Sequence, residues 1–285
     1  MLNERVFSIR SKIACGDVFP RFPTSPVQKF ASRPNGQALG FRGLFHLLFS
    51  DFCIIIFRMS NLYIVATPIG NLEDITFRAI ETLKSVDIIL CEDTRVTRKL
   101  LERYSISVPT ISYHSQSKIK KIDDIIKLLR DGKNLALVSD AGTPAISDPG
   151  SFLVSKIKEA LGDTVRIIPI PGPSALISAL SASGFNASDF LFLGFLPHKK
   201  GRQTLFGEIQ ESKRTVVFYE SPHRFIKSLE SLVSVLEPKR LVVVGRELTK
   251  IYEEIRVGTA QELLDCYNAN QDKIRGEFVV IVSAI

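Results

Sequence analysis

The sequence is poor in the residues that build metal sites and disulfide frameworks. Its four cysteines lie far apart, at positions 15, 53, 91 and 266, and form no Cys-x-x-Cys pair. This spacing excludes a disulfide scaffold and is typical of reduced thiols in a cytoplasmic protein. The four histidines, at positions 46, 114, 198 and 223, form no His-Glu-x-x-His or other paired motif. We therefore expect a cytoplasmic protein without a metal site.

Long apolar runs and an excess of charge are also missing from most of the chain. The apolar run 44–57 is short and is interrupted by His46, Ser50 and Asp51, so it is unable to span a bilayer, and we expect no membrane contact. Of the net charge of +7, residues 1–58 contribute +5 (eight Lys or Arg and three Asp or Glu), which leaves +2 for the remainder. Such a small excess does not by itself indicate nucleic-acid binding.

Residues 1–58 differ from the rest of the chain in composition. They mix Arg, Ser, Pro and Gly without any period, so we expect no fold there. A basic, acid-poor start of this kind also resembles an organelle transit peptide. The only methionine besides Met1 is Met59, which stands two residues before the first clear strand. We therefore expect residues 1–58 to be an extension, either disordered or upstream of a translation start at Met59.

From residue 59 onward, short apolar runs alternate with amphipathic segments. The runs predict strands at 62–66, 86–91, 108–112, 135–138, 165–170, 190–195, 215–219, 241–244 and 277–283. The amphipathic segments predict helices at 73–85, 99–104, 118–131, 175–182, 225–236 and 260–268, with a further helix after Gly150. The rhythm changes in the second half of the chain, so we expect two α/β domains, 59–171 and 172–285.

Three of the predicted strands run into loops that are rich in Gly and Pro. The loops are TPIGN at 67–71, SDAGTPAISDPG at 139–150 and PGPS at 171–174. Parallel sheets bind ligands at the carboxyl ends of their strands, so three such loops on one edge would form a cleft that contains the carboxylate of Asp140. The alternative is a set of capped turns with a solvated Asp140. For the helix after the second loop we expect Asp148 as N-cap and Pro149 as first helical residue.

These loops lack the motifs of the common nucleotide-binding sites. No Gly-x-x-x-x-Gly-Lys-[Ser/Thr] sequence is present, and TPIGN is not Gly-x-Gly-x-x-Gly. The loops offer backbone groups, small side chains and one carboxylate. Such a lining suits a compact adenosine-type ligand with a charged tail, and its carbonyl and carboxylate groups would complement a sulfonium cation.

Eight motifs follow one another through residues 62–285. They are ATPIGNL at 66–72, CEDTR at 91–95, SDAGTPAISDPG at 139–150, PGPSA at 171–175, GFLP at 194–197, YESPHR at 219–224, RELTK at 246–250 and RGEF at 275–278. With these motifs the chain resembles the tetrapyrrole methylase superfamily and, within it, the family of small-subunit ribosomal RNA ribose 2′-O-methyltransferase I. One motif alone would be unspecific, but eight in order are specific. Residues 1–58 have no counterpart in the pattern.

The resemblance implies two α/β domains of the class III S-adenosylmethionine methyltransferase type, with S-adenosylmethionine in the cleft between them. Carried over by motif, the cofactor site comprises Pro68, Asp140, Ala141, Gly142, Thr143, Ser174, Ala175, Tyr219, Arg246, Glu247 and Gly276. The implied reaction is 2′-O-methylation of a cytidine ribose in the decoding centre of 16S rRNA. The implied partner is 16S rRNA or the small ribosomal subunit, and the implied assembly is a homodimer.

Methyl transfer to a ribose hydroxyl depends on alignment and benefits from a base that accepts the proton. The catalytic candidates are Glu92, Asp93 and Arg95, which stand just past a predicted strand. The alternative is structural: the two acids cap the next helix, and Arg95 forms an ion pair with one of them.

The candidates for RNA binding are basic residues in two motifs of the second half. They are Lys199, Lys200, Arg202, His223 and Arg224. Lysine and arginine in a Gly-containing loop are suited to contact backbone phosphates, but such a run is also found on an ordinary solvated surface. His223 beside Pro222 and His114 beside Tyr113 have structural alternatives as well, although His114 is able to stack on a base.

Two other functions remain open at this stage. Methylation of a tetrapyrrole carbon is the chemistry of the wider superfamily, but it would favour an apolar, acid-binding cleft. The presumed cleft here is instead ringed by acids, namely Glu92, Asp93, Glu220 and Glu247. A catalytically silent RNA- or nucleotide-binding protein is the other alternative, and transfer of labelled methyl to rRNA would distinguish it.

Overall fold

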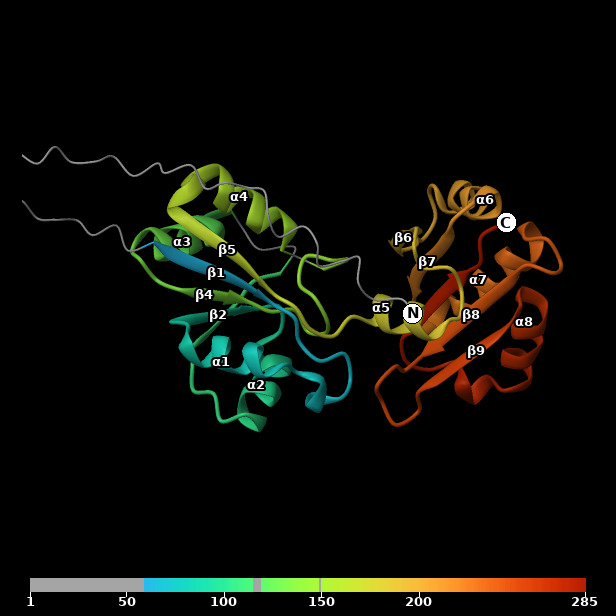
Figure 1. Cartoon of the computed structure of the whole chain (residues 1–285), viewed down its shortest axis with the longest axis horizontal. Helices are drawn as coiled ribbons and strands as arrows, with labels where there is room; N and C mark the ends of the chain where they lie inside the picture. The colour runs from blue at the N-terminus through green and yellow to red at the C-terminus, as the bar shows by residue number, and fades with distance from the viewer. Residues whose placement is uncertain (1–58, 115–118, 149) are drawn as a thin grey trace, which may run out of the picture. The chain divides into compact units, whose positions relative to one another are not determined.

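The computed structural model describes residues 59–114, 119–148 and 150–285. The predicted extension 1–58 and Pro149, predicted as the first residue of a helix, lie outside this part. Within it, the chain forms two five-stranded sheets one after the other, and each carries helices on both faces (Figure 1). None of the described helices is long and apolar enough to cross a membrane.

The first sheet is parallel, with the strand order β3-β2-β4-β1-β5. Its strands are β1 (Ser60–Val65), β2 (Ile88–Cys91), β3 (Thr110–Ser112), β4 (Leu135–Leu137) and β5 (Val165–Ile170). The inner strands β2 and β4 consist of apolar, largely buried residues because both faces of the sheet are covered, whereas the edge strands β3 and β5 are less buried. The strands β4, β1 and β5 are neighbours, so the three Gly/Pro loops that follow them leave the sheet at one place.

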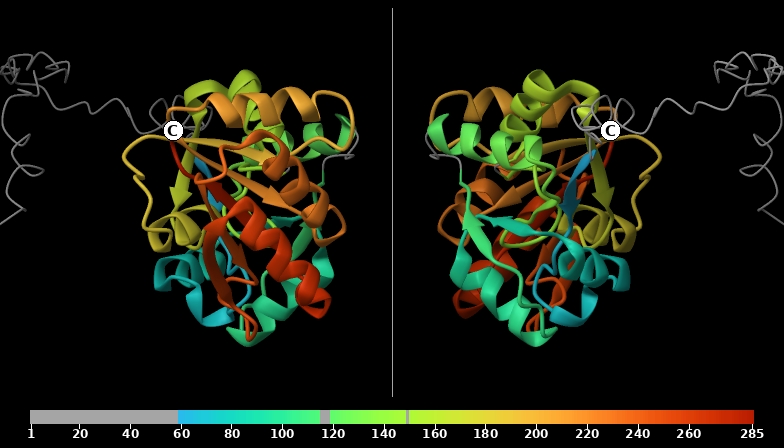
Figure 2. Two further views of the ribbon diagram at one scale, coloured as in Figure 1. Left: turned by 90° about the vertical axis from the view of Figure 1, so that its right-hand side faces the viewer. Right: turned by 90° about the vertical axis from the view of Figure 1, so that its left-hand side faces the viewer.

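Four helices cover the first sheet, two on each face (Figures 1 and 2). Helices α1 (Phe77–Ser85) and α2 (Thr94–Arg103) pack on one face. Helices α3 (Ile119–Arg130) and α4 (Ser151–Leu161) pack on the other. Short 3-10 turns at Leu72–Asp74 (η1) and Gly162–Thr164 (η2) complete the connections. This half of the chain is therefore a three-layer α/β unit whose loops at the strand ends are free to form a site.

The second sheet is mixed, with the strand order β6-β7-β10-β8-β9. Its strands are β6 (Phe190–Phe195), β7 (Thr215–Glu220), β8 (Leu241–Arg246), β9 (Glu254–Thr259) and β10 (Phe278–Val282). Helices α6 (Arg202–Glu211), α7 (Pro222–Val235) and α8 (Ala260–Ala269) cover one face, and a 3-10 turn at Gln271–Lys273 (η3) follows α8. Helix α5 (Ala175–Ala182) packs on the opposite face together with Ile69 from the TPIGN loop.

Three features differ from the sequence-based predictions. Helix α6 and strand β9 were not predicted at all. The prediction that Asp148 caps helix α4 is wrong: the N-cap is Gly150, with φ of 143°, and no side chain makes a capping hydrogen bond. The physical reason is the backbone of the preceding loop, because Ala145 and Ser147 adopt positive φ values of 71° and 60° and turn the chain before the helix begins.

Candidate functional site

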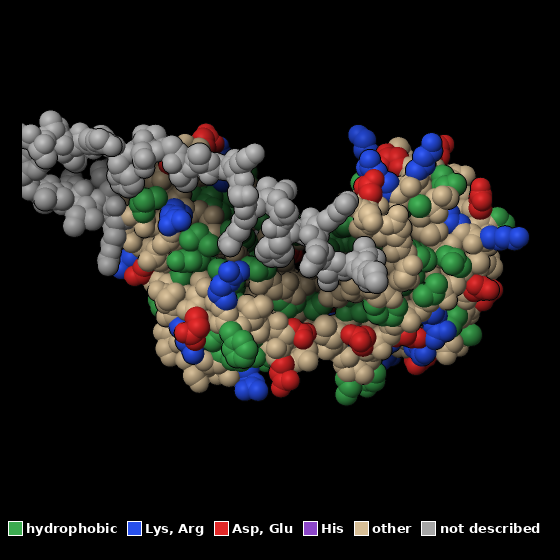
Figure 3. Space-filling view, in the orientation of Figure 1, with side chains coloured by type: hydrophobic (Ala, Val, Ile, Leu, Met, Phe, Trp, Pro, Cys, Tyr) green, Lys and Arg blue, Asp and Glu red, His purple; other side chains and the backbone are tan. Residues whose placement is uncertain are grey.

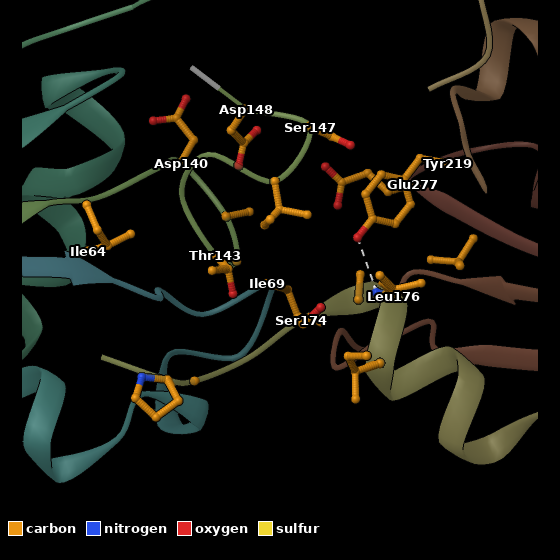
Figure 4. A pocket seen from close by; sticks show the side chains of 18 of the residues that line it. Ile64, Ile69, Asp140, Thr143, Ser147, Asp148, Ser174, Leu176, Tyr219 and Glu277 are labelled. Carbon is orange, nitrogen blue, oxygen red and sulfur yellow. Dashed lines mark hydrogen bonds between the residues drawn. The ribbon is translucent and has the colours of Figure 1, made fainter. Parts of the chain in front are cut away.

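A cavity of about 640 Å³ lies at the carboxyl ends of β1, β4 and β5. The loops after β4 and β5 and the start of α5 form much of its wall, and Phe195, Tyr219 and Glu277 to Val279 contribute from the second sheet. Most of the wall is apolar, with isoleucines at positions 64 and 69 (Figure 4) and at positions 146 and 177. Carboxylates at positions 140, 148 and 277 also face it. The cavity therefore combines a large apolar surface with a few acidic groups, as small-molecule sites do.

Backbone hydrogen bonds hold two of the loops together. The N–H of Thr67 donates to the carbonyl oxygen of Gly142 at 2.9 Å, and the N–H of Gly142 donates to Thr67 at 3.1 Å. The hydroxyl of Thr67 donates to the carbonyl oxygen of Ser139 at 3.1 Å. Because the loops are fixed to each other by main-chain groups, the cavity wall is formed before any ligand binds.

The PGPS turn approaches the end of β1 so closely that any side chain at position 172 would crowd Ala66. A Cβ atom there would lie 3.0 Å from the Cβ of Ala66 and 3.3 Å from its carbonyl oxygen. The turn leads into α5, whose N-cap is Ser174, a residue that makes no side-chain capping hydrogen bond. The backbone N–H of Leu176 donates to the hydroxyl of Tyr219 at 3.2 Å (Figure 4). This bond connects the start of α5 to strand β7.

Two carboxylates of the SDAGTPAISDPG loop differ in their bonding. Asp140 accepts a hydrogen bond from the backbone N–H of Asp93 at 3.1 Å and so connects the ends of β4 and β2. Asp148 points toward the cavity (Figure 4). Burial, together with the nearby carboxylates of Glu92 and Asp140, raises the pKa of Asp148 to about 6, although the hydroxyl of Ser139 offsets part of the increase. Asp148 is therefore a carboxylate that gains and loses a proton near neutral pH.

Most of the predicted cofactor residues lie on the wall of the cavity. These are Asp140, Ala141, Gly142, Thr143, Ser174, Ala175 and Tyr219. The others, which are not on the wall, are Pro68, Arg246, Glu247 and Gly276. Arg246 is buried and donates to the carbonyl oxygens of Tyr252 and Arg275. Glu247 accepts from the backbone N–H of Glu277 at 3.0 Å, so it supports a residue of the wall without belonging to it.

The three catalytic candidates separate in the structure. Glu92 lines a second cavity, of about 490 Å³, and burial with a contribution from Asp140 raises its pKa. Asp93 caps α2 by accepting from the N–H of Arg95 at 2.8 Å, and its carboxylate pairs with the guanidinium of Arg95 at 2.6 Å. These bonds lower the pKa of Asp93 to about 2. Asp93 and Arg95 thus form the helix cap and ion pair of the structural alternative. Glu92 instead lines the second cavity.

The basic candidates for RNA binding also divide into two groups. Lys199, Lys200 and His223 are exposed, and Lys and Arg side chains, with acids among them, project around the β6–α6 region in Figure 3. Arg202 and Arg224 instead form ion pairs with Glu220 at 3.3 and 2.8 Å, and their side chains are only 12% and 16% exposed. The structure therefore places these two arginines on a buried carboxylate, away from the solvated surface that a phosphate contact needs.

Several wall residues were not predicted from the sequence. Among them are Ile64, Ile69, Ile146, Ser147, Asp148, Leu176, Phe195 and Glu277. For Asp148 the available signal was its place in the same loop as Asp140, but the following Pro149 favoured a helix cap. For Glu277 the signal was its place directly after Gly276 in the RGEF motif. Among the described residues, no group of three or more His, Cys, Asp or Glu is arranged to hold a metal ion.

Comparison with known proteins shows similarity along most of the chain. The model of the family described as Tetrapyrrole (Corrin/Porphyrin) Methylases matches residues 61–264. A protein of Mesorhizobium japonicum named ribosomal RNA small subunit methyltransferase I is 50% identical over 222 residues, 78% of this chain and 74% of the relative. The protein of the same name from Escherichia coli O157:H7 is 47% identical over 223 residues, with coverage of 78% and 77%.

Solved structures with low sequence identity share the fold. The X-ray structure of cobalt precorrin-4 methyltransferase, a cobalamin biosynthetic enzyme, is 18% identical and has a TM-score of 0.57, covering 79% of this chain and 95% of that one. The structure of uroporphyrin-III-C-methyltransferase from Thermus thermophilus is 16% identical, with a TM-score of 0.54 and coverage of 79% and 94%. At these identities the similarity concerns the arrangement of strands and helices alone.

Proposed function

Because the chain belongs to the tetrapyrrole methylases and, within them, to the family of ribosomal RNA small subunit methyltransferase I, we propose that it methylates small-subunit ribosomal RNA with S-adenosylmethionine as donor. Membership confirms the expected fold and makes the protein a methyltransferase. The proposed reaction is 2′-O-methylation of a cytidine ribose in 16S rRNA. The position that the resemblance implies is cytidine 1402 of the decoding centre.

The main support for the proposal is the lining of the cavity of about 640 Å³, called the first cavity below, because this lining fits the methyl donor. S-adenosylmethionine, when bound, supplies a methyl group that a sulfonium cation activates. The apolar side chains of Ile64, Ile69 and Phe195 would bury the uncharged parts of such a ligand. The carboxylates of Asp140 and Glu277 would compensate its positive charges. The free hydroxyl of Ser174 at the start of α5 supplies a further hydrogen-bonding group.

The acceptor RNA needs a basic surface next to the cavity, and the loop before α6 supports this role. Lys199 and Lys200 are exposed there, and the loop follows β6, whose last residue, Phe195, lines the cavity. We expect the two lysines to contact backbone phosphates and so to position the RNA without reading its sequence.

The remaining parts of the proposal concern organisation. We propose that residues 59–171 and 172–285 act as two domains around the cofactor, and that the protein works in the cytoplasm as a homodimer. The family match and the alignments with relatives, which lie within about four-fifths of the chain, support the assignment of activity to this region. Light scattering of the purified chain at several concentrations tests the assembly, and a mass equal to one chain throughout would contradict it.

The experiment that tests the function measures methyl transfer directly. The protein is incubated with methyl-labelled S-adenosylmethionine and small ribosomal subunits that lack the modification, and the RNA is digested to nucleosides. We expect label in 2′-O-methylcytidine. Label on a base or on another nucleoside would contradict the proposed chemistry. Absence of label in RNA, with cofactor binding intact, would reject the RNA acceptor and lead to a test of porphyrinoid acceptors.

A further inference from the structure

A second cavity adjoins the proposed cofactor cavity. Its volume is about 490 Å³, and it is lined by Glu92, Tyr113, Ser147, Asp148, Gly150, Ser151 and Phe152. Ser147 and Asp148 line both cavities, so one short segment forms the wall that the two spaces share. A group held in the second cavity would therefore lie close to a ligand in the first.

The lining of the second cavity is suited to an uncharged base. Phe152, on the first turn of α4, is 56% exposed, although a large aromatic side chain is usually buried. The ammonium of Lys156 lies over the ring, 5.9 Å from its centroid. The remaining exposed surface of the ring, at the edge of a polar cavity, is flat enough for a single-stranded base to stack on it. No Lys or Arg occurs among the described residues of the lining. The lining therefore offers a nucleoside a stacking surface and hydrogen-bond acceptors.

The polar groups of the second cavity are carboxylates. Glu92 comes from the end of β2 and Asp148 from the loop after β4. An ionised carboxylate accepts hydrogen bonds only, so it matches the amino group of cytosine and the hydroxyl groups of ribose. Glu92 lines only the second cavity, whereas Asp148 lines both cavities and stands where they meet. The two acids are thus placed for different parts of one nucleoside.

We propose that the second cavity is the subsite for the acceptor nucleoside, in which a pyrimidine base stacks on Phe152 and the carboxylate of Asp148 accepts the proton of the ribose 2′-hydroxyl. The assignment rests on the proposed function and adds the residue that accepts the proton, Asp148. In the step, the bond between the ribose oxygen and the methyl carbon forms while the bond between that carbon and sulfur breaks. The electron pair of the broken bond stays on sulfur, which becomes a neutral thioether, and the proton moves to Asp148.

The charges around Asp148 agree with a role as proton acceptor. Glu92 faces it from β2, Asp140 from the same loop and Tyr219 from β7, and no basic group faces it among the described lining of either cavity. The pKa of Asp148, raised to about 6 mainly by burial, leaves the carboxylate ionised at neutral pH but more basic than an ordinary aspartate. Burial and Asp140 raise the pKa of Glu92, although nearby His114 offsets part of the increase, and Glu92 is left as the acceptor for the base.

The first test separates stacking from cofactor binding. In Phe152→Ala we expect the KM for the RNA substrate to increase at least tenfold, while the affinity for S-adenosylmethionine, measured by calorimetry, stays unchanged. The matched control is Phe77→Ala, because Phe77 is 90% exposed on α1 and lines neither cavity. A second readout needs no cofactor: an RNA with a fluorescent cytidine analogue at the acceptor position should be quenched by the wild type and by Phe77→Ala, but not by Phe152→Ala. Equal quenching by all three proteins would overturn the stacking assignment.

The second test concerns the proton. In Asp148→Asn, which keeps the shape of the side chain, we expect kcat to fall by about 10² to 10⁴-fold with the KM for RNA nearly constant. Asp163→Asn is the control, since Asp163 is exposed in η2 and lines neither cavity. Unchanged kcat would overturn the role of Asp148 as base, and loss of cofactor affinity would assign Asp148 to the donor site. Failure of the wild type to label RNA would instead reject the proposed function, so the two failures are distinguishable.

Discussion

The loop after β4 and the last residue of β7 both carry a carboxylate, Asp148 and Glu220, but the surroundings of these two carboxylates are opposite. Glu220, the last residue of β7, is fully buried. It forms ion pairs with Arg202 and Arg224 and accepts a hydrogen bond from the hydroxyl of Ser228. Asp148 has no basic group facing it in the described lining and lies beside other acids. A carboxylate surrounded by donors fixes the structure, whereas one kept near other carboxylates retains a proton affinity that chemistry is able to use.

The network around Glu220 has a specific structural task. Arg224 donates to the carbonyl oxygen of Leu196 at 2.6 Å and Arg202 to that of Pro197 at 3.3 Å. Through these bonds the buried carboxylate holds the segment that leads to Lys199 and Lys200. The two arginines therefore fix the backbone that carries the proposed RNA-binding lysines, without contacting RNA themselves.

The largest effect is expected where the paired carboxylate is removed. Glu220→Ala leaves two largely buried guanidinium groups without their counter-charge, so we expect the free energy of unfolding to fall by about 3–5 kcal/mol in urea titrations. Glu230→Ala on the exposed side of α7 is the control and should change stability by less than about 0.5 kcal/mol. A change in Glu220→Ala as small as in the control would show that the network contributes little.

The next largest effect is expected on cofactor binding in a variant of Asp140. The carboxylate of Asp140 lines the first cavity and accepts a hydrogen bond from the N–H of Asp93. S-adenosylmethionine at 100 times its Kd should stabilise the wild type by about 2.7 kcal/mol, visible as a shift in Tm. In Asp140→Ala this shift should disappear because the cavity loses a carboxylate and its connection to β2. Asp163→Ala should keep it. A normal shift in Asp140→Ala would place the cofactor elsewhere.

A smaller effect is expected at the exposed lysines. Replacing Lys199 and Lys200 by alanine should weaken RNA binding and reduce the slope of log K against log salt by about 1.4, which corresponds to two contacts with single-strand phosphates. The value of kcat at saturating RNA should not change. Lys239→Ala, an exposed lysine after α7, serves as control. An unchanged slope would mean that the loop does not touch the backbone of the RNA.

The smallest effect is a gain of stability on removing the charge of Asp148, which has no ion-pair partner in the described lining. Above its pKa of about 6 the folded Asp148 is ionised in a buried position beside Glu92 and Asp140, whereas an unfolded Asp148 ionises near 3.8 without this burial and repulsion. Stability is therefore lost as the pH rises through this window, and Asp148→Asn should avoid the loss. We expect the variant to melt a few degrees above the wild type at pH 8 and at the same temperature at pH 4. A higher Tm at both pH values would indicate a packing effect.

The parts of the fold with simple apolar patterns could be predicted from the sequence. Strands β5 and β6 and helix α5 have the predicted bounds because turn residues stand directly beside their apolar runs. Helix α6 was missed because it contains Gly207 and buries only Phe206 and Ile209, too few for a visible period. Strand β9 was missed because it is an edge strand whose apolar Ile255 and Val257 are exposed while its charged residues are partly buried.

The site could be predicted from the sequence where its residues lie in loops that directly follow a strand, but not where tertiary contacts decide the position of a side chain. The loops after β4 and β5 supply the wall as expected, because parallel strands deliver their ends to one edge. The positions of Asp148, Arg202 and Arg224 depend on backbone turns and on Glu220, a partner 18 residues from one arginine and four from the other. Contacts of this kind arise from tertiary packing, which no local pattern records.

The segment Ser147–Asp148, which separates the two cavities, has a thermodynamic consequence for the order of events. If a ligand on one side changes the position or the charge of this wall, it changes the affinity for the ligand on the other side, and the effect is reciprocal. A cation in the first cavity favours the ionised form of Asp148, and the acceptor hydroxyl needs that form. Donor and acceptor should therefore bind with positive cooperativity, and the neutral thioether product should weaken the hold on the methylated RNA and so favour its release.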